Sequence, residues 1–369
     1  VQACGDAHLS NFGMFATPER VLAFDINDFD ESHPAPFEWD VARLAVSAVI
    51  AADEIGLRPG AGVELARTAA RRYREQVRAL STQTFLDIWY SKVDLREHVE
   101  DAQSRYSRKE LEKASKVRAK ARRKTNMGAL ARLAERDGDG WRIKDDPPLI
   151  VGADVDMAMR QRLHGFFDGY VASLPPEMLP LIRHYKLVDF ARKVVGVGSV
   201  GTESHIALLI GSHGDDALFL QLKEASDSVL ERYTVSDLFD HQGERVVFGQ
   251  RLMQASSDIF LGWASAKVRG RKRVDFYVRQ LNDYKAGANV AGMSERRLSH
   301  FVEMCAEALA RAHARSGSAS AISGYLGKGS TFDKAMGTFA LAYADQNRND
   351  FAAFEAAAEA SRFEVRRGA

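Results

Sequence analysis

A glycine-rich connection between two strand-like segments constrains the fold of this chain most strongly. The segments VDFARKVVGV (188–197) and SHIALLI (204–210) show the short apolar alternation of β-strands, and a GxGxxG motif from Gly196 to Gly201 joins them. A dinucleotide-binding Rossmann fold needs this motif between a strand and a helix, so that fold is disfavoured. A glycine-rich hairpin whose backbone amides can contact phosphates fits better. Taken alone the motif is weak, because glycines in a hairpin often serve only the turn.

A third predicted strand, LFLQLKEA (218–225), carries Lys223 close to this hairpin. A lysine in this place can hold phosphate oxygens, and a glutamate on the following helix can orient the lysine through an ion pair. We expect that partner to be Glu244, in the helical segment GERVVFGQRLMQA, with Glu224 and Glu231 as alternatives. The other interpretation of Lys223 is an ordinary lysine at a strand edge.

Two further strand-like segments, IFLGWASAKV and RVDFYVRQLND, complete a predicted antiparallel sheet of five strands with one helix. Helical spacing of apolar residues predicts helices in much of the remaining chain, and within 61–90 it places Leu86 and Trp89 in the core. We therefore expect an α+β chain. Its predicted parts are 1–94 with an acidic loop, a basic helical insertion at 95–150, a helical connection at 151–187, the small sheet unit at 188–285 and C-terminal helices at 286–369.

The first thirty residues contain two acidic segments, GDAHLSN and FDINDFD. A loop carrying Asp6 and Asn11, followed by a short hairpin that carries Asp25, can bring two carboxylates and an amide oxygen to one point. Such oxygen ligands suit Mg²⁺, and one aspartate can remain to act as a base. The other interpretation is a surface turn, since Asp and Asn favour turns in any case.

Two polar residues lie within predicted amphipathic helices. Asp40 falls in the first turn of the helical segment PFEWDVARLAVSAVIAADEIG, where a carboxylate suits the helix dipole. Its alternative role is to brace the acidic loop. His313 lies on the apolar side of the segment MSERRLSHFVEMCAEALARAHARSG, where a lone histidine is more often packed than a ligand.

Composition limits the classes of protein that remain. The 369 residues include only two cysteines, Cys4 and Cys305, which argues against a disulfide framework and against a zinc site with Cys/His spacing. The formal net charge is +1, so no global charge bias indicates a partner. No apolar run approaches the roughly 18 residues needed to span a bilayer. We expect a cytoplasmic protein without a membrane span.

A basic stretch at 105–124 holds ten Lys or Arg residues against two Glu. A solvated helix is the expected structure for such a charge run. Binding to nucleic acid or to an anionic substrate is the alternative, but no interleaved aromatic residues favour contact with single strands.

Together these segments resemble the protein-kinase-like superfamily, most closely its aminoglycoside-phosphotransferase type. The catalytic loop of that type runs His-Gly-Asp-x-His-x-x-Asn, and here Cys4 to Asn11 match it except that Cys4 replaces the first His. The resemblance implies a two-lobe fold with a small antiparallel-sheet lobe and a mainly helical lobe. In those families the small lobe precedes the catalytic loop, whereas here it follows, so the resemblance implies a circular permutation.

The resemblance also implies roles for individual residues, with ATP and Mg²⁺ as cofactors and an unknown acceptor. Asp6 would position or deprotonate the acceptor, while His8 would brace the loop. The metal would be held by Asn11 and Asp25, although Asp28, followed by Phe29, could equally be the metal ligand; Asp30 adds a third carboxylate. Lys223, oriented by Glu244, would bind the phosphates. The nucleotide would lie under Gly196, Gly198, Ser199 and Gly201.

The chain is similar over most of its length to an uncharacterised bacterial family, domain of unknown function 2252. The segments that carry this similarity are GDAHLSNFG, FDINDFDE, WDVARLA, GVGSVGT, LQLKEA and GQRLMQASSDIFLG. Two functions compete with an ATP-dependent phosphotransferase. One is a nucleotide-binding pseudokinase or regulatory module; the other, less favoured, is a metallophosphoesterase, because Asp6-Ala7-His8 also resembles the first element of such two-metal sites.

Overall fold

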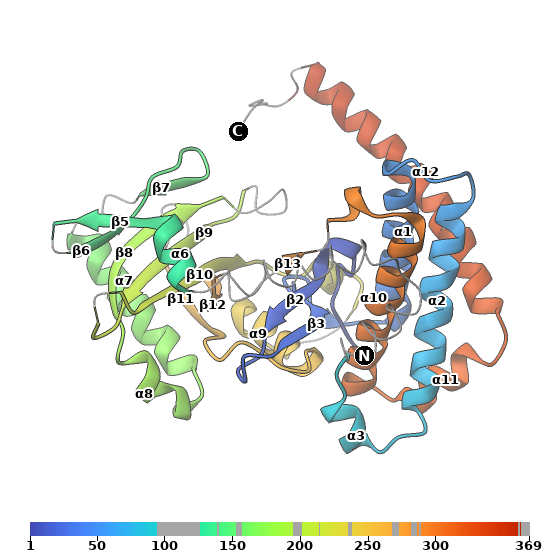
Figure 1. Ribbon diagram of the computed structural model, residues 1–369, viewed down its shortest axis with the longest axis horizontal. Coiled ribbons are helices and arrows are strands. Elements are labelled where there is room, and N and C mark those ends of the chain that lie inside the picture. The colour runs from blue at the N-terminus through green and yellow to red at the C-terminus, as the bar shows by residue number, and fades with distance from the viewer. Residues whose placement is uncertain are drawn as a thin grey trace, which may run out of the picture.

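The computed structural model places a sheet with its covering helices on one side, a group of long helices on the other, and an N-terminal hairpin between them (Figure 1). It describes residues 1–93, 126–138, 140–152, 157–194, 201–213, 215–234, 238–267, 273–281, 286–287, 289–360 and 362. Helices and antiparallel strands are both abundant, so the predicted α+β class is confirmed.

The larger sheet has six strands and all its neighbours are antiparallel. Its strands in spatial order are β11 (Gly262–Ala266), β12 (Val274–Gln280), β10 (Ala217–Ala225), β9 (Ser204–Ile210), β8 (Lys186–Lys193) and β7 (Ile150–Gly152). The five predicted strands are therefore present, and β7 adds a sixth at one edge. Lys223 on β10 lies opposite Tyr277 on β12, so both side chains project from the same face.

Helices and a hairpin cover this sheet. Helix α7 (Met157–Ser173) packs on one face, where Phe166 and Tyr170 join the same apolar cluster as Leu220 and Phe276. Part of the other face lies against α6 (Asn126–Leu133), β5 (Ala134–Asp137) and β6 (Gly140–Ile143). Full burial of an apolar side chain such as Leu220 contributes about 1.5–3 kcal/mol.

Helix α9 (Gln242–Met253) follows β10 in the chain and packs against β12. Their approach depends on Gly243, because a Cβ atom there would lie 2.3 Å from the carbonyl oxygen of Phe276. Only glycine allows this helix to reach the strand without a backbone shift. A short helix, α8 (Leu179–Ile182), leads into β8 and packs in the same apolar cluster as α7.

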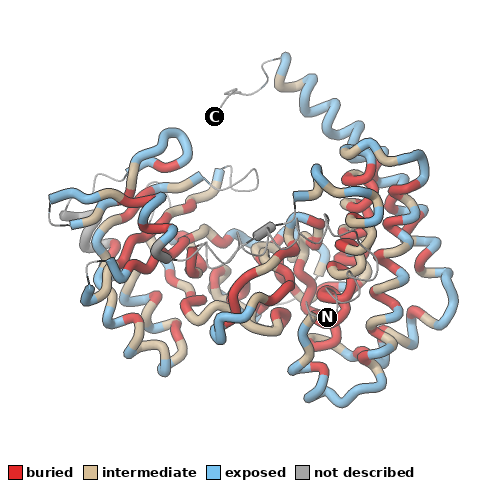
Figure 2. The backbone as a smooth tube through the Cα atoms, viewed as in Figure 1, coloured by how far each residue is buried: buried red, intermediate tan, exposed pale blue. Residues whose placement is uncertain are grey.

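The helical part is built around α1 (Phe37–Glu54), α2 (Ala61–Leu80) and α10 (Glu295–Ser316). Its fully buried side chains include Leu44, Tyr73 and Leu309, and Figure 2 shows the buried backbone concentrated where these helices meet. The long α12 (Thr331–Glu359) packs on α1 and α2 with its first half, while its second half is exposed. No helix in the described part of the chain is both long and apolar enough to cross a membrane.

The predicted core of segment 61–90 is partly wrong. Helix α2 ends at Leu80, and α3 (Phe85–Tyr90) begins after a cap in which Thr84 accepts the backbone N–H of Asp87. The break turns the second segment away from the core, so Leu86 is 61% exposed and Trp89 is 38% exposed.

The first forty residues lie between the sheet and the long helices (Figure 1). They form β1 (Gln2–Ala3) paired with β4 (His33–Pro34), the 3₁₀ turn η1 (Leu9–Asn11) and a hairpin of β2 (Phe12–Ala16) and β3 (Leu22–Ile26), to which β13 (Ala286–Gly287) pairs. Gln2 N–H donates to the hydroxyl of Ser316 at 3.1 Å, so this segment starts beside the C-terminal end of α10.

Candidate active site

The loop at Cys4 to Asn11 is held by the carboxylate of Asp40. One oxygen of Asp40 accepts the backbone N–H of Cys4 at 2.6 Å and the other accepts that of Gly5 at 2.9 Å. Gly5 has φ of +87°, and a Cβ atom on it would lie 2.3 Å from the carbonyl oxygen of Glu31, so the turn requires glycine here. Of the two roles considered for Asp40, bracing the loop is therefore the one observed.

His313 completes this support from α10. Its Nε2 lies 3.1 Å from Asp40 Oδ2 and its Nδ1 lies 2.8 Å from the hydroxyl of Tyr73, with the imidazole fully buried. The loop lacks a histidine at Cys4, whose thiol pKa is raised well above its usual value by burial and by Asp40. A histidine from a distant helix thus contacts the carboxylate that holds the loop.

The carboxylate of Asp6 lies between two nitrogen groups. Its Oδ1 accepts Nε of Arg43 at 2.6 Å, and its Oδ2 lies 3.5 Å from Nε2 of His8. Nδ1 of His8 accepts the backbone N–H of Ser10, which leaves the proton of a neutral imidazole on Nε2, facing Asp6. Burial lowers the pKa of His8, although Asp6 acts in the opposite direction. His8 thus contacts both the backbone of the loop and the carboxylate of Asp6, and Arg43 is a further partner of Asp6.

Asn11 is tied to both acidic segments. Its side-chain N–H donates to the carbonyl oxygen of Asp6 at 2.7 Å, which leaves its amide oxygen as the group able to bind a cation. The backbone N–H of Asn27 donates to the carbonyl oxygen of Asn11 at 2.8 Å. Since Asp28 follows Asn27 directly, the amide of Asn11 and the carboxylate of Asp28 come from neighbouring backbone segments.

Asp25 is a structural carboxylate. It is 1% exposed, and both of its oxygens lie 2.6 Å from Nη2 of Arg311 on α10. Its oxygens also accept the backbone N–H groups of Ile26 and Ala255. With its lone pairs engaged in this way, Asp25 is disfavoured as a metal ligand, and Asp28 is the better placed of the two alternatives.

Lys223 reaches from β10 to the carboxylates that follow β3. Its Nζ donates to Oδ2 of Asp30 at 2.5 Å and lies 3.7 Å from Oδ1 of Asp28. Burial alone would lower the pKa of Lys223, but the neighbouring Tyr277, Asp28 and Asp30 raise it. Burial and Asp28 raise the pKa of Asp30, and Lys223 opposes that shift. Lys223 is thus held as a cation between two carboxylates.

The ring of Tyr277 lies near two cations. Nζ of Lys223 lies 5.5 Å from the centre of its ring, and the guanidinium carbon of Arg279 lies 5.7 Å from it. The hydroxyl of Tyr277 and Oδ1 of Asp30 are buried, and neither has a hydrogen-bond partner among the described residues. Buried polar atoms of this kind usually bind water or a ligand.

The predicted ion pair between Glu244 and Lys223 is not formed. Glu244 lies in the first turn of α9, where its backbone N–H donates to His241. The alternatives are engaged elsewhere: Glu224 accepts a backbone N–H from the connection before β9, and Glu231 closes a capping box. The partners of Lys223 instead come from the N-terminal segment, where Asp28 and Asp30 follow β3.

Sequence reasoning missed the residue next to Glu244. Arg245 is 2% exposed and donates to three backbone carbonyls, those of Asp30, Ser32 and Ser226. It thus fixes the segment after Asp28 against α9. An arginine in an amphipathic helix normally suggests the solvent face, so nothing in the sequence pattern indicated this contact.

Several predicted site residues lie outside the described part of the chain. These are Gly196, Gly198 and Ser199 of the glycine-rich connection, as well as the basic stretch at 105–124. Gly201 is described and has φ of +87°, a conformation that favours glycine.

Among the described residues, no group of three or more His, Cys, Asp or Glu side chains could hold a metal ion by itself. The site does fit Mg²⁺ bound in the usual manner of nucleotide sites, where one or two protein oxygens are joined by phosphate oxygens and water. Here the protein oxygens would be those of Asn11 and Asp28.

Comparison with known proteins identifies a family match. Residues 1–357 match the family described as "Uncharacterized protein conserved in bacteria (DUF2252)". No curated protein and no solved structure matches the chain.

Proposed function

The chain belongs to the DUF2252 family of bacterial proteins, whose description names no reaction. From the geometry of the candidate site, we propose that the protein is a Mg²⁺-requiring, ATP-dependent phosphotransferase. The observation that carries this proposal is the position of Lys223. A lysine from a sheet strand meets Asp28, from a segment almost two hundred residues away, beside the loop of Asp6 and Asn11. This is the set of groups that phosphoryl transfer requires.

Each residue has a role that matches its contacts. Asn11 and Asp28 would hold Mg²⁺, which supplies charge neutralisation at the phosphates. Lys223 would exchange its contact with Asp30 for phosphate oxygens. Asp6 would accept a hydrogen bond from the acceptor hydroxyl, and would take its proton as the acceptor oxygen bonds to the γ-phosphorus and the bond to the leaving ADP oxygen breaks. Arg43 and His8 would keep Asp6 oriented.

We further propose a kinase-like two-lobe arrangement with permuted order. In the unpermuted order of such a fold, the helix equivalent to α10 would run directly into the loop of Asp6. The support is the contact of Gln2 with Ser316 at the end of α10, together with the bond from His313 to Asp40. A permutation preserves a fold when the rejoined ends lie close together.

The full-length chain tests the reaction directly. We expect MgATP to raise its melting temperature and to be consumed when a panel of hydroxyl compounds and proteins is supplied. Asp6→Asn should retain MgATP binding and lower transfer by roughly 10²–10⁴-fold, the usual contribution of a general base. Asp28→Asn should weaken binding only when Mg²⁺ is present. The exposed Asp53→Asn serves as the control, and wild-type protein that does not bind MgATP would refute the proposal.

A nucleotide-binding pseudokinase is the second candidate. It is favoured by the contacts that already occupy the central groups, Asp6 with Arg43 and Lys223 with Asp30. This function would be supported instead of the transferase if the wild type bound MgATP but consumed ATP no faster than Asp6→Asn does.

A further inference from the structure

Arg279 on β12 joins the two chain segments that form the proposed nucleotide site. Its Nε donates to Oε1 of Gln221 and its Nη1 donates to the carbonyl oxygen of Asn27, each at 3.1 Å. Gln221 lies two residues before Lys223 on β10, and Asn27 directly precedes Asp28. One guanidinium group therefore contacts both the strand of the proposed phosphate-binding lysine and the segment of the proposed metal ligand.

The pairing of β10 with β12 fixes this arrangement. Gln221 lies opposite Arg279, and Lys223 lies opposite Tyr277. Because side chains alternate between the two faces of a strand, all four project from one face of the sheet. The ring of Tyr277 lies within the roughly 6 Å range at which an aromatic ring attracts the cations of Lys223 and Arg279. Arg279 is thus linked to Lys223 both through Gln221 and through this ring.

The charge of Arg279 is compensated by neighbouring acidic groups. Burial alone would lower the pKa of its guanidinium group, but the neighbouring Tyr277, Asp28, Asp30 and Asp258 raise it. Two of these carboxylates, Asp28 and Asp30, belong to the segment after β3. The positive charge of Arg279 therefore helps to hold that acidic segment against the sheet.

The backbone of Asn27 is fixed on both sides. Its N–H donates to the carbonyl oxygen of Asn11 at 2.8 Å, and its carbonyl oxygen accepts the bond from Arg279. Asn11 and Asp28 are the two residues proposed to hold Mg²⁺. The contact with Asn11 comes from the N-terminal segment itself, whereas the contact with Arg279 comes from the sheet. Loss of Arg279 would thus allow Asp28 to shift relative to Lys223.

We propose that Arg279 is a positioning residue: through the carbonyl group of Asn27 and the side chain of Gln221, it holds Asp28 and Lys223 at the spacing that a Mg²⁺-bound nucleotide requires. This inference rests on the function proposed above. It adds a residue that binds neither the metal nor the phosphates but aligns the groups that do.

The Mg²⁺ requirement of ATP binding tests this role on the full-length chain. Lysine keeps the charge but lacks the planar donor fork of arginine, so Arg279→Lys should not hold both partners. We expect its affinity for MgATP to fall about 10–100-fold, as for other residues that orient metal ligands, and its half-saturating Mg²⁺ concentration to rise. Isothermal titration measures both, and the affinity for ATP in EDTA should change much less.

A purely structural role for Arg279 gives a different result. Arg279→Lys would then have a lower melting temperature but an unchanged Mg²⁺ requirement, and this outcome would overturn the proposal. Arg273→Lys is the matched control, because Arg273 is exposed and lies directly before the same strand. This control should bind MgATP like the wild type.

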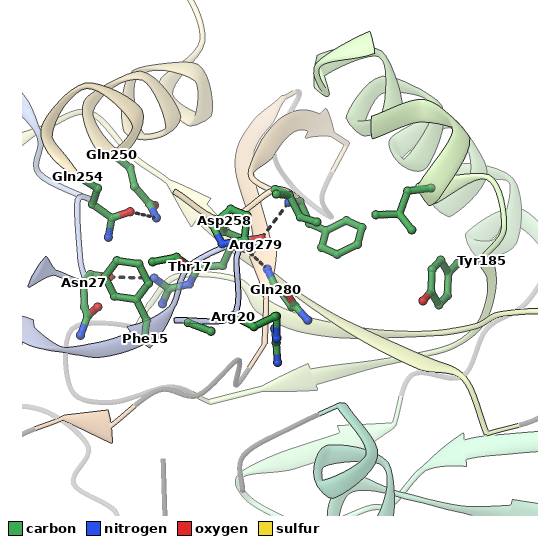
Figure 3. A pocket seen from close by; sticks show the side chains of 15 residues that line it. Phe15, Thr17, Arg20, Asn27, Tyr185, Gln250, Gln254, Asp258, Arg279 and Gln280 are labelled. Atoms are coloured by element: carbon green, nitrogen blue, oxygen red, sulfur yellow. Dashed lines mark hydrogen bonds between the residues drawn. The ribbon is translucent and has the colours of Figure 1, made fainter. Parts of the chain in front are cut away.

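The surroundings of Arg279 permit a second test by chemical rescue. Figure 3 shows Arg279 in the wall of a cavity of about 240 Å³. In Arg279→Ala the space left by the side chain would adjoin this cavity, so a guanidinium ion from solution can occupy it. We expect millimolar guanidinium chloride to restore part of the lost MgATP affinity, whereas sodium chloride should not. Equal effects of guanidinium on this variant and on the wild type would contradict the assigned contacts.

Hydrogen exchange of the chain without nucleotide separates this inference from the proposed function. Arg279→Lys should speed exchange in 26–30 and leave exchange within α1 unchanged. Wild-type protein that does not bind MgATP would refute the phosphotransferase, while faster exchange in 26–30 would still show that Arg279 holds the segment of Asp28. Unchanged exchange in 26–30 would overturn the positioning role.

Discussion

Two buried polar side chains on α10 hold the N-terminal segment in place. Arg311 contacts both oxygens of Asp25, and two positions later His313 contacts Asp40. Both residues belong to one helix, and together they contact the carboxylate that holds the loop of Asp6 and the carboxylate on the strand that leads to Asp28. Buried side chains of α10 therefore help to position the N-terminal segment that carries the proposed functional groups.

The Asp25–Arg311 pair permits a quantitative test. Removing one partner leaves the other charge buried, which costs about 3–5 kcal/mol. We expect Asp25→Asn and Arg311→Met each to lower the free energy of unfolding by about that amount, and the double variant to lose less than the sum by about 0.5–3 kcal/mol. Urea denaturation measures all three.

The exposed pair Asp53–Arg348 is the matched control for this cycle. Its side chains are about half exposed, so Asp53→Asn and Arg348→Gln should each change stability by less than about 1 kcal/mol. Additive losses in the Asp25–Arg311 cycle would show that the two groups do not stabilise each other.

Some of the site could be predicted from sequence. The alternation of LFLQLKEA placed Lys223 on a strand, and the spacing of GDAHLSN brought Asp6 and Asn11 into one loop. The choice between Asp25 and Asp28 could not be made, because it depends on where β3 ends and on a partner 286 residues away. Arg245 and Arg311 were missed for a related reason: charged residues in helices usually face water, and only tertiary contacts show that these do not.

At the scale of single elements, His205 on strand β9 makes the free energy of unfolding depend on pH. The ring of His205 stacks on Phe190 with centroids 4.7 Å apart. Burial, together with Arg192, lowers the pKa of His205 to about 4. The carboxylate of Glu203 lies 3.5 Å from this imidazole and opposes part of this shift, because a carboxylate favours the charged form of the ring.

The direction of the pH effect follows from this shift. Between about pH 6.5 and pH 4, the unfolded chain binds a proton at His205 that the folded chain does not bind. The stability contributed by the neutral ring is therefore present above pH 6.5 and is lost as the pH falls through that window. We expect a loss of up to about 3 kcal/mol from this residue. Urea denaturation should show that the free energy of unfolding differs less between pH 7.5 and pH 5 for His205→Gln than for the wild type. An identical difference would rule out His205 as its source.

For the whole molecule, a nucleotide at the proposed site would join two regions that are distant in sequence. MgATP at about 100 times its dissociation constant should stabilise the folded chain by about 2.7 kcal/mol. We expect hydrogen exchange to slow in both 22–30 and 217–225, because the ligand would contact Asp28 and Lys223 together. Lys223→Met should lose protection in both segments. Protection confined to one of them would contradict a shared site.

The distance in sequence between Asp25 and Arg311 also affects how the protein is made. At about 5–20 residues per second, the ribosome adds the 286 residues between them in roughly 15 to 60 seconds. During synthesis the N-terminal segment therefore exists for a time without α10, α9 or Lys223, and Asp25 has not yet met Arg311. The segment with the proposed catalytic chemistry is translated before every element that supports it, so we expect it to reach its folded form only after the last of those elements has left the ribosome.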